Sequence, residues 1–204
     1  MKVSDGNLVW HEAHVTRADR VRLLGQTPAT VWFTGLSGAG KSTLAFALEK
    51  RLMEMGRAAY VLDGDNVRHG LSRDLGFSPE HRTENIRRIA EVARLMNDAG
   101  LIVITAFISP YRADRELARQ VIGAENFLEV HVSTPLSVCE ERDPKGFYKR
   151  ARAGGLPGYT GVSAPYEPPL EPALAISTAD SSTASCIDGV LAVLGPHIGS
   201  AGNE

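Results

Sequence analysis

Residues 35–43 read Gly35-Leu-Ser-Gly-Ala-Gly-Lys-Ser-Thr43 and follow the short apolar run 31–33. After them, leucines recur every four residues at 44, 48 and 52, which predicts a buried helix. A strand, a turn of pattern Gly-x-x-x-x-Gly-Lys-Ser and a helix, in this order, form the context of a phosphate-binding loop. Glycine lets the backbone take positive φ and turn N–H groups toward an anion, and the helix start adds further donors. The predicted ATP-binding residues are Gly35, Leu36, Ser37, Gly38, Ala39, Gly40, Lys41, Ser42 and Thr43.

Three polar side chains complete the predicted phosphate chemistry. The ammonium group of Lys41 is expected to reach the β- and γ-phosphates, and the hydroxyl of Ser42 to ligate Mg²⁺. Asp63 follows a second short apolar strand at 58–62, so it lies at the carboxyl edge of the sheet, where ligands bind in open α/β folds. Asp63 is expected either to hold Mg²⁺ with Ser42 or to accept the proton of the acceptor hydroxyl, and both roles stay open.

Composition restricts the class of protein. A chain of 204 residues accommodates one catalytic domain, and a net charge of -2 gives no general attraction to nucleic acid or to an anionic membrane. Cys139 and Cys186 lack metal-ligand spacing, and no apolar run approaches the roughly 20 residues that span a bilayer. No charged-then-apolar leader opens the sequence, so the expected location is cytoplasmic and neither nucleic acid nor membrane is an expected partner.

Strand and helix patterns alternate along the chain. Strands are predicted at 58–62, 101–107, 127–132 and 174–176, with helical periodicity at 86–96, 117–121 and 187–194 between them. This alternation favours an α/β, three-layer phosphate-loop kinase fold with a mostly parallel central sheet. Residues 1–30 form an expected N-terminal extension, in which Thr16 to Asp19 reads as the capping box of a short helix packed on the core. Residues 31–204 form the kinase domain, with a mobile basic lid at about 143–169.

The rest of the sequence favours phosphoryl transfer to a small acceptor. It contains no Asn-Lys-x-Asp guanine signature and no apolar run that ends in Asp-Glu, which hydrolytic ATPases commonly have. Two alternatives stay open: another small-molecule kinase, acting on a nucleoside or a sugar, and a non-catalytic nucleotide-binding regulatory module.

Several long motifs resemble those of the adenylylsulfate (APS) kinases. Besides the phosphate loop, they begin at Asp63, Asp74, Arg82, Phe107 and Lys145, and they read Asp-Gly-Asp-Asn-Val-Arg-His-Gly-Leu, Asp-Leu-Gly-Phe, Arg-Thr-Glu-Asn-Ile-Arg-Arg, Phe-Ile-Ser-Pro-Tyr-Arg and Lys-Gly-Phe-Tyr-Lys-Arg-Ala-Arg-Ala-Gly. The likeness runs from about residue 7 to residue 194. It implies transfer of the ATP γ-phosphoryl to the 3′-hydroxyl of APS, giving 3′-phosphoadenylylsulfate (PAPS) and ADP in sulfate assimilation, and it implies a homodimer.

The resemblance also implies a set of acceptor-site residues. Arg68 and Arg82 offer planar forks for the phosphosulfate, and Asn85 adds an amide. The adenine of APS is expected between the rings of Phe77 and Tyr159. The full expected set of APS contacts is Asp65, Arg68, Phe77, Arg82, Asn85, Ile108, Ser109, Lys145, Gly158 and Tyr159.

Ser109 stands at a position where the resemblance implies a phosphoserine intermediate. No histidine or other base adjoins it in sequence, and direct in-line transfer needs no covalent step. We therefore place it with Lys41 and Asp63 as a catalytic candidate but expect a substrate-binding or accessory role. The lid departs from the family pattern at Tyr159, where phenylalanine is commoner, and at Pro157, which we expect to alter lid closure and the affinity for APS rather than the reaction.

Overall fold

The computed structural model describes residue 9 and residues 11–198. Parts of the expected N-terminal extension (1–8 and 10) and the end of the expected kinase domain (199–204) lie outside the described residues. The first strand, β1 (Thr30–Thr34), includes the last residue of the expected extension. The division at residue 30 stays a prediction.

The five described strands form one parallel sheet. In addition to β1, they are β2 (Ala59–Asp63), β3 (Ile102–Ala106), β4 (Phe127–Val132) and β5 (Leu174–Ile176). Their order is β2-β3-β1-β4-β5, and each neighbouring pair is parallel. The predicted strands differ from these bounds by one residue or less at each end. Because all strands point the same way, the segments that follow them meet at one edge of the sheet.

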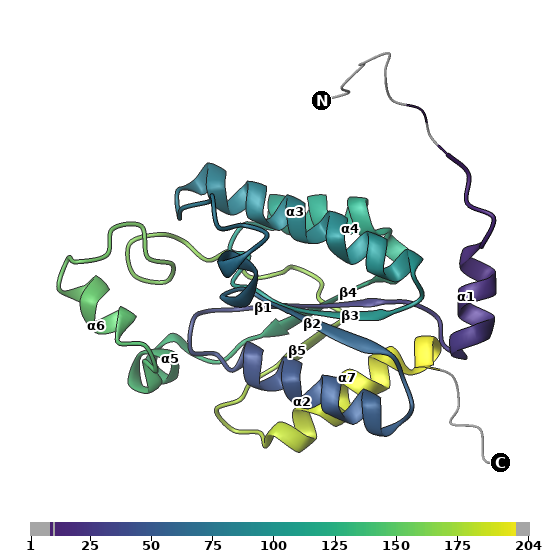
Figure 1. The fold of residues 1–204 in the computed structure, drawn as a ribbon. Coiled ribbons are helices and arrows are strands. Elements are labelled where there is room, and N and C mark those ends of the chain that lie inside the picture. Colours follow the sequence, from purple (N-terminus) through teal and green to yellow (C-terminus); the bar gives the residue numbers. More distant parts are fainter. Residues whose placement is uncertain (1–8, 10, 199–204) are drawn as a thin grey trace.

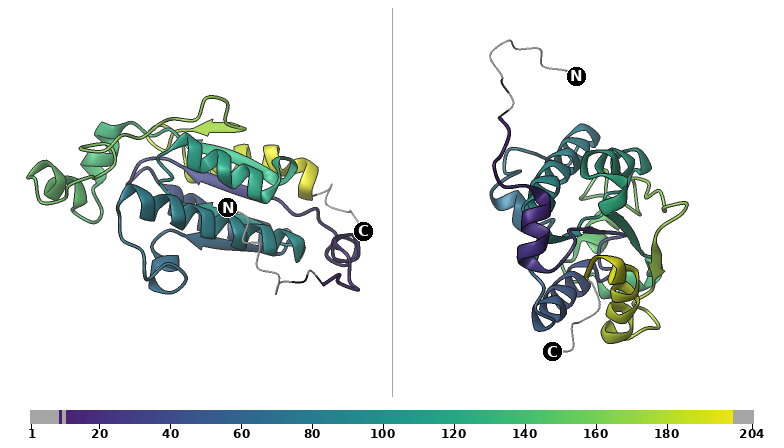
Figure 2. Two further views of the ribbon diagram at one scale, coloured as in Figure 1. Left: turned by 90° about the horizontal axis from the view of Figure 1, so that it is seen from above. Right: turned by 90° about the vertical axis from the view of Figure 1, so that its right-hand side faces the viewer.

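Two pairs of helices cover the two faces of the sheet (Figures 1 and 2). Helices α2 (Lys41–Glu54) and α7 (Thr183–Ile198) lie on one face, and α3 (Pro79–Asp98) and α4 (Arg112–Ile122) lie on the other. Strand side chains alternate between these layers: Val31 and Phe33 belong to the core under α2 and α7, whereas Trp32 belongs to the core under α3 and α4. A sheet that is buried on both faces explains the continuous apolar strands. The three-layer α/β prediction is confirmed.

Helix α3 begins well before its apolar pattern. Ser78 caps its N-terminus and Pro79 occupies the first position, so the helix starts before the first periodic apolar residue, Ile86. Arg82 and Asn85 therefore lie in the first two turns of the helix. The opening turns are polar because they face the cavity edge and solvent, which is why hydrophobic periodicity gave a late start.

Helix α1 (Arg17–Leu24) lies at the end of the sheet remote from α5 (Leu136–Arg142) and α6 (Phe147–Arg152) (Figure 1). The predicted capping box is present, because the hydroxyl of Thr16 accepts a hydrogen bond from the N–H of Asp19 while the Asp19 carboxylate accepts one from the N–H of Thr16. Arg17 donates a hydrogen bond of 2.7 Å to the side chain of Asn126, which ties α1 to the body of the protein.

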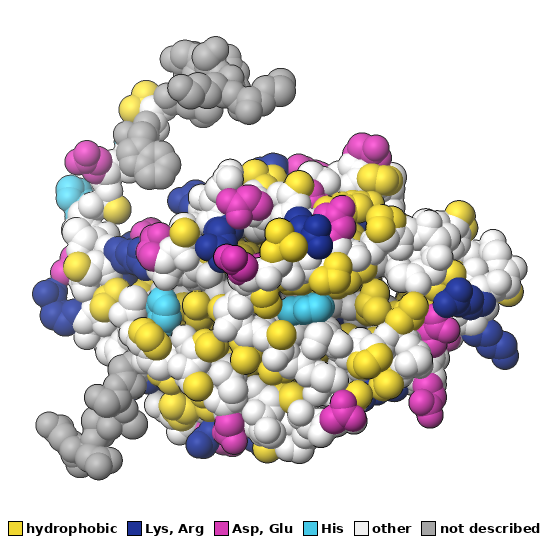
Figure 3. Space-filling model, turned by 180° about the vertical axis from the view of Figure 1, so that it is seen from behind, with side chains coloured by type: hydrophobic (Ala, Val, Ile, Leu, Met, Phe, Trp, Pro, Cys, Tyr) yellow, Lys and Arg dark blue, Asp and Glu magenta, His cyan; other side chains and the backbone are white. Residues whose placement is uncertain are grey.

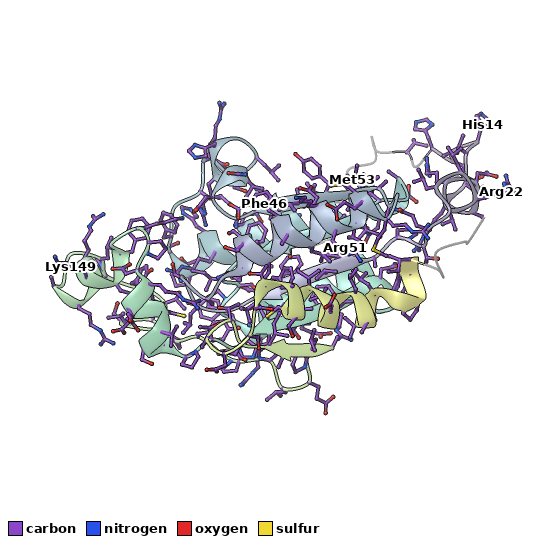
Figure 4. All side chains as sticks on the ribbon, turned by 90° about the horizontal axis from the view of Figure 1, so that it is seen from below. His14, Arg22, Phe46, Arg51, Met53 and Lys149 are labelled. Carbon is purple, nitrogen blue, oxygen red and sulfur yellow. The ribbon has the colours of Figure 1, made fainter. Side chains whose placement is uncertain are left out.

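Charged side chains of both signs are interspersed on the face shown in Figure 3. On the underside, Phe46, Arg51 and Met53 project from α2, whereas Lys149 projects from α6 at the opposite end from His14 and Arg22 (Figure 4). Among the described residues, no helix combines the length and the apolar character needed to cross a bilayer.

Candidate active site

The phosphate loop connects β1 to α2 and has no room for side chains at its glycines. Gly35, Gly38 and Gly40 have φ of 153°, 75° and 101°. A Cβ at Gly35 would lie 2.5 Å from the carbonyl oxygen of Val132, and one at Gly38 would lie 2.9 Å from that of Cys139. Both the backbone conformation and the close approach therefore require glycine, as predicted from the motif.

Lys41 folds back into the loop. Its Nζ donates hydrogen bonds to the carbonyl oxygens of Gly35, at 2.9 Å, and Leu36, at 2.6 Å. The residue is only 8% exposed, and burial lowers the pKa of its ammonium group to about 8. A cation in this position lacks the hydration that would otherwise stabilise it, so phosphate oxygens are strong partners for it.

Ser42 and Asp63 meet across the gap between α2 and β2. The Ser42 hydroxyl donates a 2.7 Å hydrogen bond to Oδ2 of Asp63, and Oδ1 accepts from the backbone N–H of Asp65 at 3.0 Å. The described residues contain no group of three or more His, Cys, Asp or Glu side chains arranged to hold a metal. One hydroxyl and one carboxylate nevertheless fit Mg²⁺, which favours oxygen ligands and takes the remaining ones from water and substrate phosphates.

A cavity of about 990 Å³ opens in front of these groups. It is lined by the phosphate loop, the segment after β2, the start of α3, the loop after β3, the end of α5, the segment after β5 and residues of the predicted lid (143–169). Of the predicted site residues, those in its wall are Ser37, Gly38, Gly40, Lys41, Ser42, Thr43, Asp63, Asp65, Arg68, Phe77, Arg82, Asn85, Ile108, Ser109, Lys145, Gly158 and Tyr159. Gly35, Leu36 and Ala39 are not in the wall; the first two hold Lys41 through their carbonyls, and the carbonyl of Ala39 accepts from Thr134 and Thr178.

The two predicted phosphosulfate arginines have protein partners. Arg68 lies over the ring of Phe77, 4.4 Å from its centroid, and donates to the carbonyl of Gly76 at 3.0 Å. Burial, together with the charge of Arg82, lowers the pKa of Arg68. Arg82 donates to the carbonyl of Phe77 at 2.9 Å and reaches the lid, where Thr160 Oγ1 accepts at 2.6 Å and the carbonyl of Gly158 accepts at 2.7 Å.

Other polar side chains of the wall differ in how fully they are paired. Lys145 of the lid forms an ion pair with Asp65. Asn85 is 4% exposed, and its side-chain oxygen has no hydrogen-bond partner among the described residues. Leaving such an acceptor unpaired is unfavourable, so a ligand that donates a hydrogen bond to it is bound more tightly.

The aromatic residues of the wall differ in exposure. Phe77 is 70% exposed, whereas Tyr159 packs edge-on against Tyr148, with ring centroids 5.1 Å apart. Tyr148 donates from its hydroxyl to the carbonyl of Ser37 at 3.0 Å, so it joins the lid to the phosphate loop. The Tyr159 hydroxyl is buried and forms no well-aligned hydrogen bond among the described residues, although the Ser37 side chain lies near it.

Ser109 has a left-handed backbone. Its φ is 39°, it is 3% exposed, and its Oγ accepts a hydrogen bond from Nε1 of Trp32 at 3.2 Å. Its carbonyl accepts from Nη1 of Arg115 at 2.7 Å. A serine held in this conformation is maintained by its surroundings, as is common at ligand-binding loops.

Comparison with known proteins identifies the family of this chain. A family model described as adenylylsulphate kinase matches residues 27–177. The adenylyl-sulfate kinase of Aeromonas salmonicida is 57% identical over 188 residues, which are 92% of this chain and 96% of the relative. This chain belongs to the adenylylsulphate kinase family.

Solved structures agree with membership of the adenylylsulphate kinase family. The Mycobacterium tuberculosis APS kinase in complex with AMPPNP and APS matches with a TM-score of 0.80 and 48% identity, over 83% of this chain and 98% of that chain. A hexameric APS kinase from Thiobacillus denitrificans matches with a TM-score of 0.64 and 41% identity, over 87% of this chain and 31% of that chain. A gluconokinase from Sinorhizobium meliloti, at 18% identity and a TM-score of 0.54, shares the fold alone. The predicted family, fold class and enzyme class are confirmed.

For this member of the adenylylsulphate kinase family, the sequence interpretation missed two arginines that organise the site. Arg142 at the end of α5 donates to the carbonyl and the hydroxyl of Thr178, at 2.7 and 2.6 Å, beside the phosphate loop. Arg115 on α4 contacts the loop that carries Ser109. Their hydrogen-bond partners are backbone carbonyls or residues distant in the sequence, so no local sequence pattern indicates that these arginines belong to the site.

Proposed function

We propose that this protein transfers the γ-phosphoryl of ATP to the 3′-hydroxyl of APS and releases PAPS and ADP. The observation that carries the proposal is that a single cavity joins the phosphate loop to a set of cationic, amide and aromatic side chains. A pocket for a second, anionic nucleotide next to the phosphates of ATP is what such a transfer requires, because positioning and charge stabilisation supply most of the rate.

We assign the donor side of the cavity to ATP. The N–H groups of residues 35–40 and the ammonium group of Lys41 would bind its phosphates. Ser42 and Asp63 would hold Mg²⁺, which when bound supplies positive charge at the phosphate oxygens. Three hydrogen-bond donors converge on the Asp63 carboxylate: the Ser42 hydroxyl and the N–H groups of Asp65 and Asn66. These contacts orient both carboxylate oxygens and support the metal-holding role over that of proton acceptor.

We assign the opposite side to APS. Arg68 and Arg82 would bind the phosphosulfate, since guanidinium groups pair with oxyanions through two parallel hydrogen bonds, and Lys145 would contact APS through its ammonium group. Asn85 has an unpaired acceptor for a donor of the ligand. Phe77 and Tyr159 would contact the adenine, and Tyr159 presents the same stacking face as phenylalanine.

We propose that residues 143–169 act as the lid. Residues of this segment line the cavity; Tyr148 bonds to the carbonyl of Ser37 in the phosphate loop, and Thr160 accepts a hydrogen bond from Arg82 on α3. Closure of such a segment excludes water and favours transfer to APS over transfer to water.

Incubation with ATP, Mg²⁺ and APS, followed by identification of the products by mass, tests the proposed function. We expect APS to gain one phosphoryl group with release of ADP, and adenosine and gluconate to react much more slowly. Preference for adenosine or gluconate would assign the protein to another small-molecule kinase activity. Tight binding of APS with no product would assign it to a regulatory module.

We further propose that the protein self-associates, as a homodimer in the simplest case. Support comes from the relative in Thiobacillus denitrificans that is described as hexameric. Light scattering of the purified chain tests this, and a monomeric mass across the accessible concentration range would contradict it. The cytoplasmic location stays a prediction of the sequence.

A further inference from the structure

Arg115 joins three segments that are distant in the sequence. Its side chain is 3% exposed, and Nε donates to the carboxylate of Glu129 on β4 at 2.6 Å. Nη1 donates to the carbonyl of Ser109 and Nη2 donates to the carbonyl of Glu167, each at 2.7 Å. Because a guanidinium group is planar and rigid, these contacts fix the relative positions of the three acceptors.

The carbonyl of Ser109 belongs to the wall of the cavity. Ile108 and Ser109 line that cavity, and the backbone of Ser109 is in the left-handed region. A serine leaves this region readily unless neighbouring groups hold it. The hydrogen bond from Arg115 to the Ser109 carbonyl is one such restraint, and the bond from Trp32 to the Ser109 hydroxyl is another.

The carbonyl of Glu167 belongs to the C-terminal end of the lid. The N–H of Glu167 donates to the carbonyl of Pro110 at 2.9 Å, and the carboxylate of Glu167 accepts from the N–H of Arg112 at 2.8 Å. The hydroxyl of the preceding residue, Tyr166, bonds to the hydroxyl of Thr34 at 3.0 Å. The lid therefore ends against the same loop that carries Ser109.

We propose that Arg115 is a positioning residue for APS phosphorylation, which couples the C-terminal anchor of the lid to the cavity wall at Ile108 and Ser109. This inference rests on the proposed function. Glu129 offsets the buried charge of Arg115 and orients its fork, while the two remaining edges of the guanidinium serve the two backbone carbonyls. Arg115 acts through these carbonyls and not through contact with substrate.

The test compares Arg115→Met and Arg115→Lys with Arg119→Met. Arg119 lies one turn further along α4, is 37% exposed at its side chain, and stacks over Phe127, 5.6 Å from the ring centroid. Arg115→Lys keeps a positive charge beside Glu129 but lacks the planar fork, so it separates loss of charge from loss of positioning. All variants are made in a Trp10→Phe background, in which Trp32 is the remaining tryptophan and its fluorescence reports on the bond to Ser109.

We expect both Arg115 variants to lower kcat/KM for APS by about 10- to 100-fold, the effect of a small misplacement of bound substrate. The KM for ATP and the affinity for an ATP analogue should stay within about twofold, and Arg119→Met should match the parent. Trp32 emission should shift in the Arg115 variants alone. Unchanged APS kinetics and unchanged emission in Arg115→Lys would overturn the inference, as would equal losses on the ATP and APS sides. If the parent protein leaves APS unaltered, the proposed function fails, while the emission shift still tests the coupling of Arg115 to Ser109.

Discussion

Replacing Ser109 with Ala removes a hydroxyl that has one protein partner, the indole N–H of Trp32 at 3.2 Å. The buried N–H is left unpaired, which lowers the free energy of unfolding by about 1–3 kcal/mol. If the hydroxyl also donates one hydrogen bond to APS, its loss removes about 0.5–1.5 kcal/mol of transition-state stabilisation, or roughly two- to tenfold in kcat/KM. Removal of a covalent nucleophile has a far larger effect, on the order of a millionfold for the serine of a hydrolase.

The measurements are the initial rate of ADP release with APS as acceptor, urea unfolding, and affinity for ATP on the same preparation. We expect kcat/KM to fall by no more than about tenfold, with unchanged ATP affinity. Mass spectrometry of the wild-type protein after incubation with ATP alone should find no added phosphoryl group at Ser109. A loss beyond about a thousandfold in Ser109→Ala protein that still binds ATP would refute the accessory role and require a phosphoserine intermediate.

Three further changes give sharp outcomes. Burial lowers the pKa of Lys41 from 10.5 to about 8, so between these pH values the unfolded chain binds more protons than the folded protein. The free energy of unfolding should therefore rise with pH across this range. Urea unfolding should show a smaller rise in Lys41→Met, which lacks the titrating group. A similar rise in both proteins would contradict the pKa shift. Gly35→Ala should lose about 3 kcal/mol of stability and its ATP affinity because its Cβ would meet the Val132 carbonyl, whereas Gly56→Ala, with open space around its Cβ, should lose about 1 kcal/mol. Calorimetric titration measures the ATP affinity and urea unfolding measures the stability. Equal losses in Gly35→Ala and Gly56→Ala would contradict the close approach of the Gly35 backbone to Val132. Tyr159→Phe should change stability in urea unfolding by less than about 1 kcal/mol, with little change in the KM for APS, since the hydroxyl forms no well-aligned hydrogen bond in the described part of the chain and has only the Ser37 side chain as a neighbouring polar group; a larger loss of stability would reveal a strong hydrogen bond at that hydroxyl.

Local patterns predicted the parts of the structure whose causes are local. The capping box at Thr16 and Asp19 depends on residues three positions apart, and the phosphate loop depends on consecutive glycines, so both were readable from the sequence. Strand positions followed from short apolar runs that are buried on both faces of the sheet. The start of α3 was placed too late because its cap and first turns carry no apolar stripe.

The lid contacts and Arg115 could not be predicted in the same way. The partners of Arg115 are two backbone carbonyls and Glu129, brought together by the strand order β3-β1-β4 and by the path of the chain at the end of the lid. A backbone carbonyl exists at every residue, so no side-chain pattern marks which one an arginine will find. On α4, Arg115 and Arg119 look alike in sequence, yet one is buried and the other is half-exposed.

The contacts of Arg82 bear on how acceptors are told apart. The same guanidinium that is assigned to the phosphosulfate donates to the hydroxyl of Thr160 and to the carbonyls of Gly158 and Phe77. A substrate that enters the cavity therefore competes with these protein groups for hydrogen bonds from the Arg82 N–H groups. An oxyanion is a stronger acceptor than a neutral carbonyl, whereas an uncharged nucleoside offers only neutral acceptors, which are no stronger than the protein groups they would replace. On the proposed assignment of Arg82 to the phosphosulfate, discrimination against adenosine begins when the acceptor binds, before any phosphoryl group is transferred.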